Sequence, residues 1–218
     1  MKEKGKRDLA FGGALVGAFA LWTALIQCVD VRPVGQNGTN IGFAGFNTWF
    51  HELTGAHMGL YAATDWLGLV PIAVCLGFGA LGLAQLLKRR SLLKVDMNLI
   101  LLGGYYVLVI LAYLVFEMIP INYRPVLIDG VMEASYPSST TLLVLAVMPT
   151  LQFQVDRRAA RPGVKKAAGV FVIAFSAFMV LGRLVSGVHW FTDIAGAVFL
   201  SAGLFLLYRG GVALTDKR

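Results

Sequence analysis

The sequence predicts an all-α integral membrane protein, and three observations support this prediction. Hydrophobic residues make up 57% of the 218 residues and charged residues only 14%, against about 45–50% and about 25% in average soluble domains. The mean hydropathy is +0.71. The charged residues also gather in clusters that leave long apolar stretches between them. This composition excludes disordered, collagen-like and disulfide-based proteins.

Six apolar stretches lie between the charged clusters, and we interpret each as a membrane-spanning helix of one domain covering residues 1–218. A helix needs about 20 residues, at about 1.5 Å each, to cross a bilayer. The last two stretches are shorter, so we expect their helices to extend into the joining segment, 183–193. The predicted spans are residues 9–29, 66–87, 97–117, 137–155, 167–186 and 192–208.

The lysines and arginines predict the orientation of these helices, because cytoplasmic loops carry an excess of both residues. With a cytoplasmic N-terminus, 16 of the 19 basic residues lie inside, at both termini and in the second and fourth connections. Only Arg32, Arg124 and Arg183 face outward. The net charge of +7 is therefore a sign of topology and does not indicate a nucleic-acid partner. We expect a multi-pass plasma-membrane protein with both termini in the cytoplasm.

Outward-facing ionisable residues near helix ends cluster in two loops, and such residues at membrane depth are usually functional. In the second loop, His189 and Asp193 are four residues apart, which predicts that they share one face of a helical turn. The carboxylate would then orient the imidazole and set its tautomer. Arg183 offers a planar set of donors that suits phosphate oxygens. The alternative is a capped helix end with a satisfied histidine and an arginine that extends to the surface.

The first outer loop contains Arg124 followed by Pro125, and then the stretch Pro-Ser-Ser-Thr-Thr at residues 137–141. Proline followed by hydroxyl side chains is typical of a helix N-terminus. The free N–H groups there can bind an anion. Taken alone, the stretch is better explained as an ordinary N-cap of the fourth helix.

Together, the three segments resemble the type 2 phosphatidic acid phosphatase superfamily of membrane lipid phosphatases, which is related to the vanadium haloperoxidases. The family pattern is KxxxxxxRP, PSGH and SRxxxxxHxxxD. The third motif is the most specific, and Arg183, His189 and Asp193 match it with the correct spacing. The resemblance implies six transmembrane helices and an active site at the outer membrane surface. It also implies dephosphorylation of an outer-leaflet lipid phosphate without a metal or cofactor.

The resemblance also implies a role for each matching residue. His189 would attack phosphorus and form a phosphohistidine, and Asp193 would orient it. Arg183 and Arg124 would hold the phosphate through their side chains. The residues at the second-motif positions would help to hold it through side chains or backbone amides: Ser138, Ser139 and Thr140.

Four positions depart from the family pattern. Glu117 stands at the position of the first-motif lysine, and Thr140 at that of the second-motif histidine, which protonates the leaving oxygen in the family. Ser139 replaces a glycine, and Gly182 replaces a serine. The usual general acid and one cation are therefore missing.

The missing acid indicates a substrate, because general-acid help is worth about 10²–10⁴-fold when an alkoxide leaves. A diphosphate needs this help least, since its leaving group is already a stable anion. An undecaprenyl-diphosphate-like lipid is therefore the preferred substrate. Arg32 is a candidate for the missing positive charge, and His57 or Glu133 for the missing proton donor.

Two other hypotheses stay open. A family member without the lysine and the histidine could bind or transport a phosphorylated lipid with little or no hydrolysis. A lipid phosphotransferase would share the first half of the mechanism. The chain has only three histidines, His51, His57 and His189, and no cluster of metal-ligating residues, so we expect no metal or haem.

Overall fold

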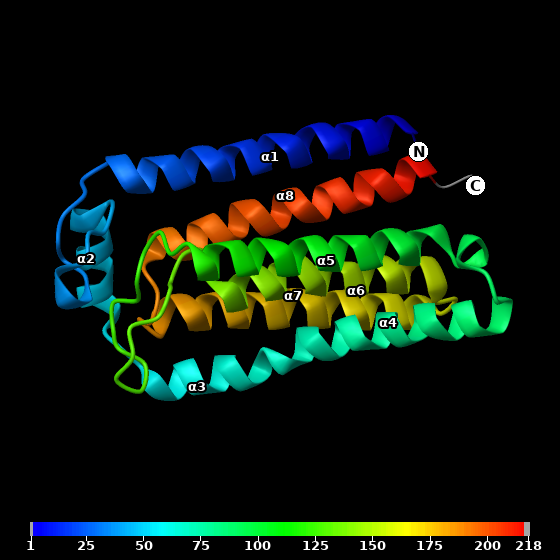
Figure 1. Cartoon of the computed structure of the whole chain (residues 1–218). Helices are drawn as coiled ribbons and strands as arrows, with labels where there is room; N and C mark the ends of the chain where they lie inside the picture. The colour runs from blue at the N-terminus through cyan, green and yellow to red at the C-terminus, as the bar shows by residue number, and fades with distance from the viewer. Residues whose placement is uncertain (1, 216–218) are drawn as a thin grey trace.

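The computed structural model describes residues 2–215, which form a bundle of α-helices with one helix across its end (Figure 1). The short helices η1 and η2 are 3-10 turns in connections. The elements in chain order are α1 (Lys2–Cys28), η1 (Gln36–Gly38), α2 (Ala44–Thr54), α3 (Met58–Leu67), α4 (Leu69–Arg89), η2 (Leu92–Lys94), α5 (Met97–Met118), α6 (Ser139–Arg158), α7 (Pro162–Val185) and α8 (Phe191–Thr215).

Each predicted span corresponds to a helix, but several bounds differ. α1 begins at Lys2, seven residues before the predicted start, because lysine, arginine and glutamate are good helix formers and do not end a helix. The second span was predicted to begin at residue 66. Instead α3 and α4 together form a candidate span over Met58–Arg89, interrupted only at Gly68. This correction places Asp65 inside a helix.

Five helical segments of the described chain are long and apolar enough to cross a membrane, and α6 is the expected span that is not among them. α6 contacts α4, α5, α7 and α8. Its polar side chains Thr141, Thr150 and Gln154 are fully buried. Because α6 is surrounded by other helices, it does not need a lipid-compatible surface. Six membrane spans therefore remain a prediction.

The beginning of α1 and the end of α8 lie together at one end of the bundle, opposite α2 and the long loop before α6 (Figure 1). The α4–α5 connection lies at the same end as the termini. The predicted grouping of basic residues is thus present along the described chain, while Lys217 and Arg218 lie outside the described residues.

Helices α1 and α8 approach closely because glycines form their contact. A Cβ atom added at Gly12 would lie 2.9 Å from the backbone oxygen of Gly203 and 2.9 Å from the backbone nitrogen of Leu207. Small residues allow helices in a membrane to pack with their backbones close together. The position of α1 beside α8 therefore depends on the hydrogen side chain of Gly12.

We expect the substitution Gly12→Ala to destabilise the protein by about 1–3 kcal/mol, because overpacking forces backbone shifts. Thermal unfolding in detergent would measure the change. Gly13→Ala is the matched control, since a Cβ atom at Gly13 meets no atom within 4 Å. Equal melting temperatures for the two variants would contradict this account of the α1–α8 contact.

Candidate active site

The site lies at the end of the bundle opposite the termini, where the segment between α5 and α6 folds back on itself. Tyr123 and Ala134 form an antiparallel bridge. The N–H group of Ser135 donates to the carbonyl of Asn122 over 2.9 Å. The indole N–H group of Trp190 donates to the carbonyl of Tyr123 over 2.8 Å. These bonds hold the folded segment against the beginning of α8.

The prediction that His189 and Asp193 share a helical turn is wrong. α8 begins at Phe191, so His189 lies in the preceding connection. The His189 Nδ1 and Asp193 Oδ2 atoms are 4.0 Å apart. Ser135 links them, because its Oγ atom lies 3.0 Å from Nδ1 and 2.5 Å from Oδ2. The connection bends the chain so that a hydroxyl from the other loop fits between the two side chains.

The hydrogen bonds around Asp193 determine the tautomer of His189. The Asp193 carboxylate accepts bonds from the Ser135 hydroxyl, from the backbone N–H group of Trp190 at 2.9 Å and from the Asn122 amide at 3.1 Å. A hydroxyl has one hydrogen, and Ser135 donates it to Asp193. Ser135 must therefore accept from Nδ1–H of His189, which leaves a lone pair on Nε2.

The surroundings keep this imidazole uncharged. His189 is 3% exposed. Burial, followed by the positive charges of Arg124 and Arg183, lowers the pKa of His189 well below its usual value. At neutral pH, His189 therefore has a free Nε2 lone pair and can act as a nucleophile or a base.

Arg183 is 1% exposed at the end of α7 and is held by α3 and α6. Its Nη2 atom lies 3.1 Å from Oδ1 of Asp65 and 2.5 Å from Oγ1 of Thr140. Its Nη1 atom lies 3.4 Å from both the Tyr61 carbonyl and Oγ1 of Thr64. Bonds to two separate helices, α3 and α6, hold the guanidinium group in one orientation.

Arg124 is also buried and forms an ion pair with Glu133, with 3.1 Å between Nη2 and Oε2. The Tyr61 ring lies close to both arginines, 5.6 Å from Cζ of Arg124 and 4.8 Å from Cζ of Arg183. An aromatic ring attracts cations through its face. Tyr61 therefore offsets part of the repulsion between two neighbouring positive charges.

Several polar atoms of this site are buried and have no hydrogen-bond partner among the described residues. They are Nε and Nη1 of Arg124, Nε of Arg183 and Nε2 of His189. Buried polar groups normally have partners, so exceptions need an explanation. Charged donors beside a free imidazole nitrogen suit an oxyanion whose central atom faces that nitrogen.

The serines of the second motif lie near the site, but their observed contacts are with other groups. Ser138 is buried, and its N–H group donates to the Asp193 carbonyl over 3.2 Å. Its hydroxyl donates to Oγ1 of Thr141 over 3.1 Å. Ser139 begins α6 and, with Glu117, lines a small cavity. Ser138 and Ser139 therefore stay predicted ligands of phosphate.

Of the residues expected to replace the missing cation and acid, only Glu133 contacts an arginine of the site. Arg32 is exposed and forms an ion pair with Asp30, with 2.6 Å between Nη2 and Oδ1. The His57 ring is exposed, and its Nε2 atom lies 2.8 Å from the Thr54 carbonyl. Neither contact connects Arg32 or His57 to the imidazole or the two buried arginines.

Sequence reasoning did not identify Ser135, Asn122, Tyr61 or Asp65 as site residues. Asp65 carried a usable signal, because it is an ionisable residue at the border of an apolar stretch. The predicted span 66–87 begins one residue after Asp65, whereas α3 continues through it. The other three residues have no distinctive spacing, and only the folded chain places them near His189 and the arginines.

These features define an integral membrane protein with a buried, histidine-centred site suited to an anion. Residues 93–213 match the PAP2 superfamily. This match covers more than half of the chain, so the protein belongs to the PAP2 superfamily, as the three motifs predicted.

A solved structure supports the fold. The chain is similar to a transmembrane PAP2-type phosphatidylglycerolphosphate phosphatase from Bacillus subtilis, with a TM-score of 0.68 and 15% sequence identity. The alignment covers 94% of this chain and 98% of that chain. At this identity the likeness shows a shared fold. A comparison with curated proteins found no significant match.

Proposed function

We propose that the protein is a phosphatase that removes phosphate from a membrane lipid phosphate or diphosphate through a phosphohistidine on His189. The observation that carries the proposal is the buried Nε2 atom of His189, which has no partner among the described residues and lies near two buried arginines. A binding site for an anion does not need a nucleophile. An imidazole with a defined tautomer and a free lone pair supplies one.

In the proposed reaction, Arg124 and Arg183 bind the non-bridging oxygens of the terminal phosphate. Nε2 of His189 attacks phosphorus, and the bond from phosphorus to the leaving oxygen breaks. The proton on Nδ1 stays on the imidazole, where Ser135 and Asp193 stabilise the positive charge of the phosphohistidine. Water then attacks phosphorus, which releases inorganic phosphate and restores His189.

We further propose that a diphosphate lipid, of the undecaprenyl diphosphate type, is preferred over a monoester. Thr140 occupies the expected position of the general acid, and its hydroxyl has no acidity near pH 7. A diphosphate leaves as an anion and needs least help from an acid. Substrate must also compete with Glu133 and Asp65 for the two arginines. The larger negative charge of a diphosphate favours it in this competition.

Phosphate release from matched lipids would test both parts of the proposal. Purified protein should release phosphate from polyprenyl diphosphates faster than from polyprenyl monophosphates, phosphatidate or phosphatidylglycerophosphate. Brief exposure to labelled substrate should leave an acid-labile label on the protein, which is typical of phosphohistidine. Faster hydrolysis of a monoester than of its matched diphosphate would contradict the substrate preference but would still support phosphatase activity.

Binding of a phosphorylated lipid without turnover is the second candidate function. Glu117 and Thr140 favour it, because they replace a cation and an acid of the family pattern. The same labelling experiment separates the two functions. Saturable binding of the lipid with neither phosphate release nor labelled protein would establish the second candidate.

We also propose that the site faces outside the plasma membrane, since most basic residues lie at the opposite end of the bundle. A cysteine introduced near Asp129 should react with a membrane-impermeant reagent added to intact cells. A cysteine introduced near Arg161 should react only after the cells are permeabilised. The reverse labelling pattern would show that the site faces the cytoplasm.

Ser135 is proposed to position His189, and the substitution Ser135→Ala tests that role. We expect about a 10²-fold fall in kcat, because the link that sets the tautomer is lost. The pH profile of kcat should also change. A merely structural role of Ser135 would leave that profile unchanged. Ser201→Ala, at a buried hydroxyl within α8, is the control. An unchanged kcat for Ser135→Ala would contradict the role.

A further inference from the structure

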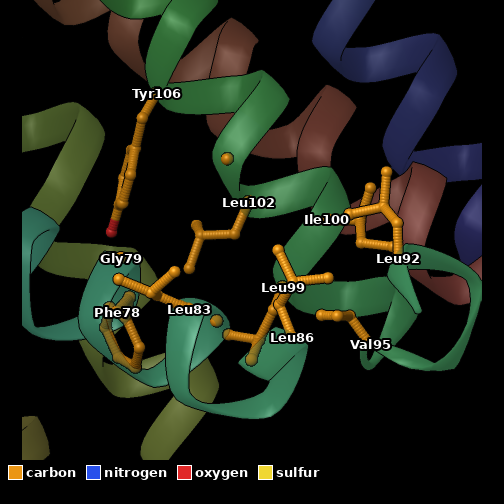
Figure 2. Close-up of a pocket in the computed structure, with 12 residues that line it drawn as sticks. Phe78, Gly79, Leu83, Leu86, Leu92, Val95, Leu99, Ile100, Leu102 and Tyr106 are labelled. Carbon is orange, nitrogen blue, oxygen red and sulfur yellow. The ribbon is translucent and has the colours of Figure 1, made fainter. Parts of the chain in front are cut away.

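An apolar groove of about 310 Å³ runs between α4 and α5, on the half of the bundle nearer the termini. Figure 2 shows its lining side chains, with Tyr106 at one end and Val95 at the other. Leu99 and Leu102 on α5 are buried beneath it, whereas Leu83 on α4 is 55% exposed. The groove therefore opens toward the outside of the bundle, where lipid would lie.

Three glycines widen the groove. A Cβ atom added at Gly79, Gly82 or Gly103 would meet no atom within 4 Å. Contact between α4 and α5 therefore does not require these glycines, unlike Gly12 at the α1–α8 contact. Tyr106 has the one polar side chain in the lining, and its hydroxyl is already bonded to Oγ1 of Thr150 at 2.7 Å. The groove thus suits an unbranched apolar chain and offers it no free polar partner.

The α4–α5 connection beside the groove is positively charged. Arg89 pairs with Asp96 at 2.9 Å and donates to the Lys94 carbonyl. The side chains of Lys88, Arg90 and Lys94 are exposed and form no ion pair with residues in the described part of the chain. Three free cations therefore lie within a few residues of Leu86, Leu92 and Val95, which line the groove.

The same connection carries leucines with little contact to the rest of the protein. Leu92 is 60% exposed and Leu93 is 94% exposed. Exposed leucines next to lysines and arginines are typical of a segment that lies in the headgroup region of a membrane. The connection therefore combines contacts for acyl chains with charges for headgroups.

We propose that the α4–α5 groove binds one acyl chain of an anionic phospholipid, whose headgroup phosphate is bound by Lys88, Arg90 and Lys94. The charge of the connection selects the occupant, since basic residues at a membrane surface attract anionic lipids. The groove begins at the basic end of the bundle, and the site of His189 lies at the other end. The proposal is therefore independent of the phosphatase reaction.

Native mass spectrometry of the full chain, mixed with phosphatidylglycerol or phosphatidylcholine of equal chain length, would test the proposal. The unaltered protein should retain one phosphatidylglycerol molecule at lipid concentrations that leave phosphatidylcholine unbound. The substitution Gly103→Leu should lower this retention at least about tenfold, because the side chain fills the groove. Gly104→Leu is the matched control, since Gly104 is also exposed but does not line the groove.

A second variant leaves the apolar groove intact. Lys88→Gln, Arg90→Gln and Lys94→Gln together should reduce the preference for phosphatidylglycerol at least about tenfold. Inorganic phosphate should not displace the lipid. Equal retention of the two lipids by the unaltered protein would overturn the proposal, as would equal effects of Gly103→Leu and Gly104→Leu. Displacement by inorganic phosphate would show a simple anion site instead.

Discussion

The substitution His189→Ala is expected to lower kcat by at least about 10³-fold, because the proposed reaction has no other nucleophile. Nε2 of His189 is buried and has no partner among the described residues. The substitution removes that atom, so the variant should retain no acid-labile phosphate label. Phosphate release and retention of labelled phosphate, measured on the same preparation, would check both effects.

The chain offers a matched control for this experiment. His57 is at the same end of the bundle, but its ring is exposed and contacts the Thr54 carbonyl. The substitution His57→Gln should change kcat by less than about threefold, within the small effects usual for surface sites. A large loss of kcat with His57→Gln would support His57 as the proton donor. Retained turnover with His189→Ala would refute the phosphohistidine mechanism.

The substitution Arg183→Lys is expected to lower kcat/KM by about 10²–10³-fold, although it keeps the positive charge. The guanidinium group contacts Asp65 and Thr140 through one nitrogen and Thr64 through another. A lysine ammonium group cannot donate hydrogen bonds to all of these oxygen atoms in the directions that the guanidinium group uses. The change should appear mainly as weaker stabilisation of the transition state, so kcat should fall together with kcat/KM.

Arg32→Lys is the control for Arg183→Lys. Arg32 pairs with Asp30 in the connection that follows α1, and this contact does not reach the imidazole. Its replacement should leave kcat/KM nearly unchanged. Neither substitution changes the net charge, so equal losses for the two variants would contradict the role given to the geometry of the Arg183 guanidinium group.

The helices and the most specific site residues could be predicted from the sequence because each depends on local pattern. Apolar stretches of about 20 residues identify membrane helices whatever their neighbours are. The spacing of Arg183, His189 and Asp193 identified the family, which the match over residues 93–213 confirms. The spans were less exact at their ends, because a charged residue such as Asp65 does not stop a helix.

The tertiary structure decided how those residues interact. His189 and Asp193 are not neighbours on a helix, and Ser135 joins them from a loop that is distant in the sequence. Asp65 reaches Arg183 from α3, across 118 residues of chain. The sequence alone determined the class of membrane protein and identified candidate site residues, since composition and motif spacing are local properties. The hydrogen-bond partners depend on long-range packing, which brings together residues whose spacing carries no signal.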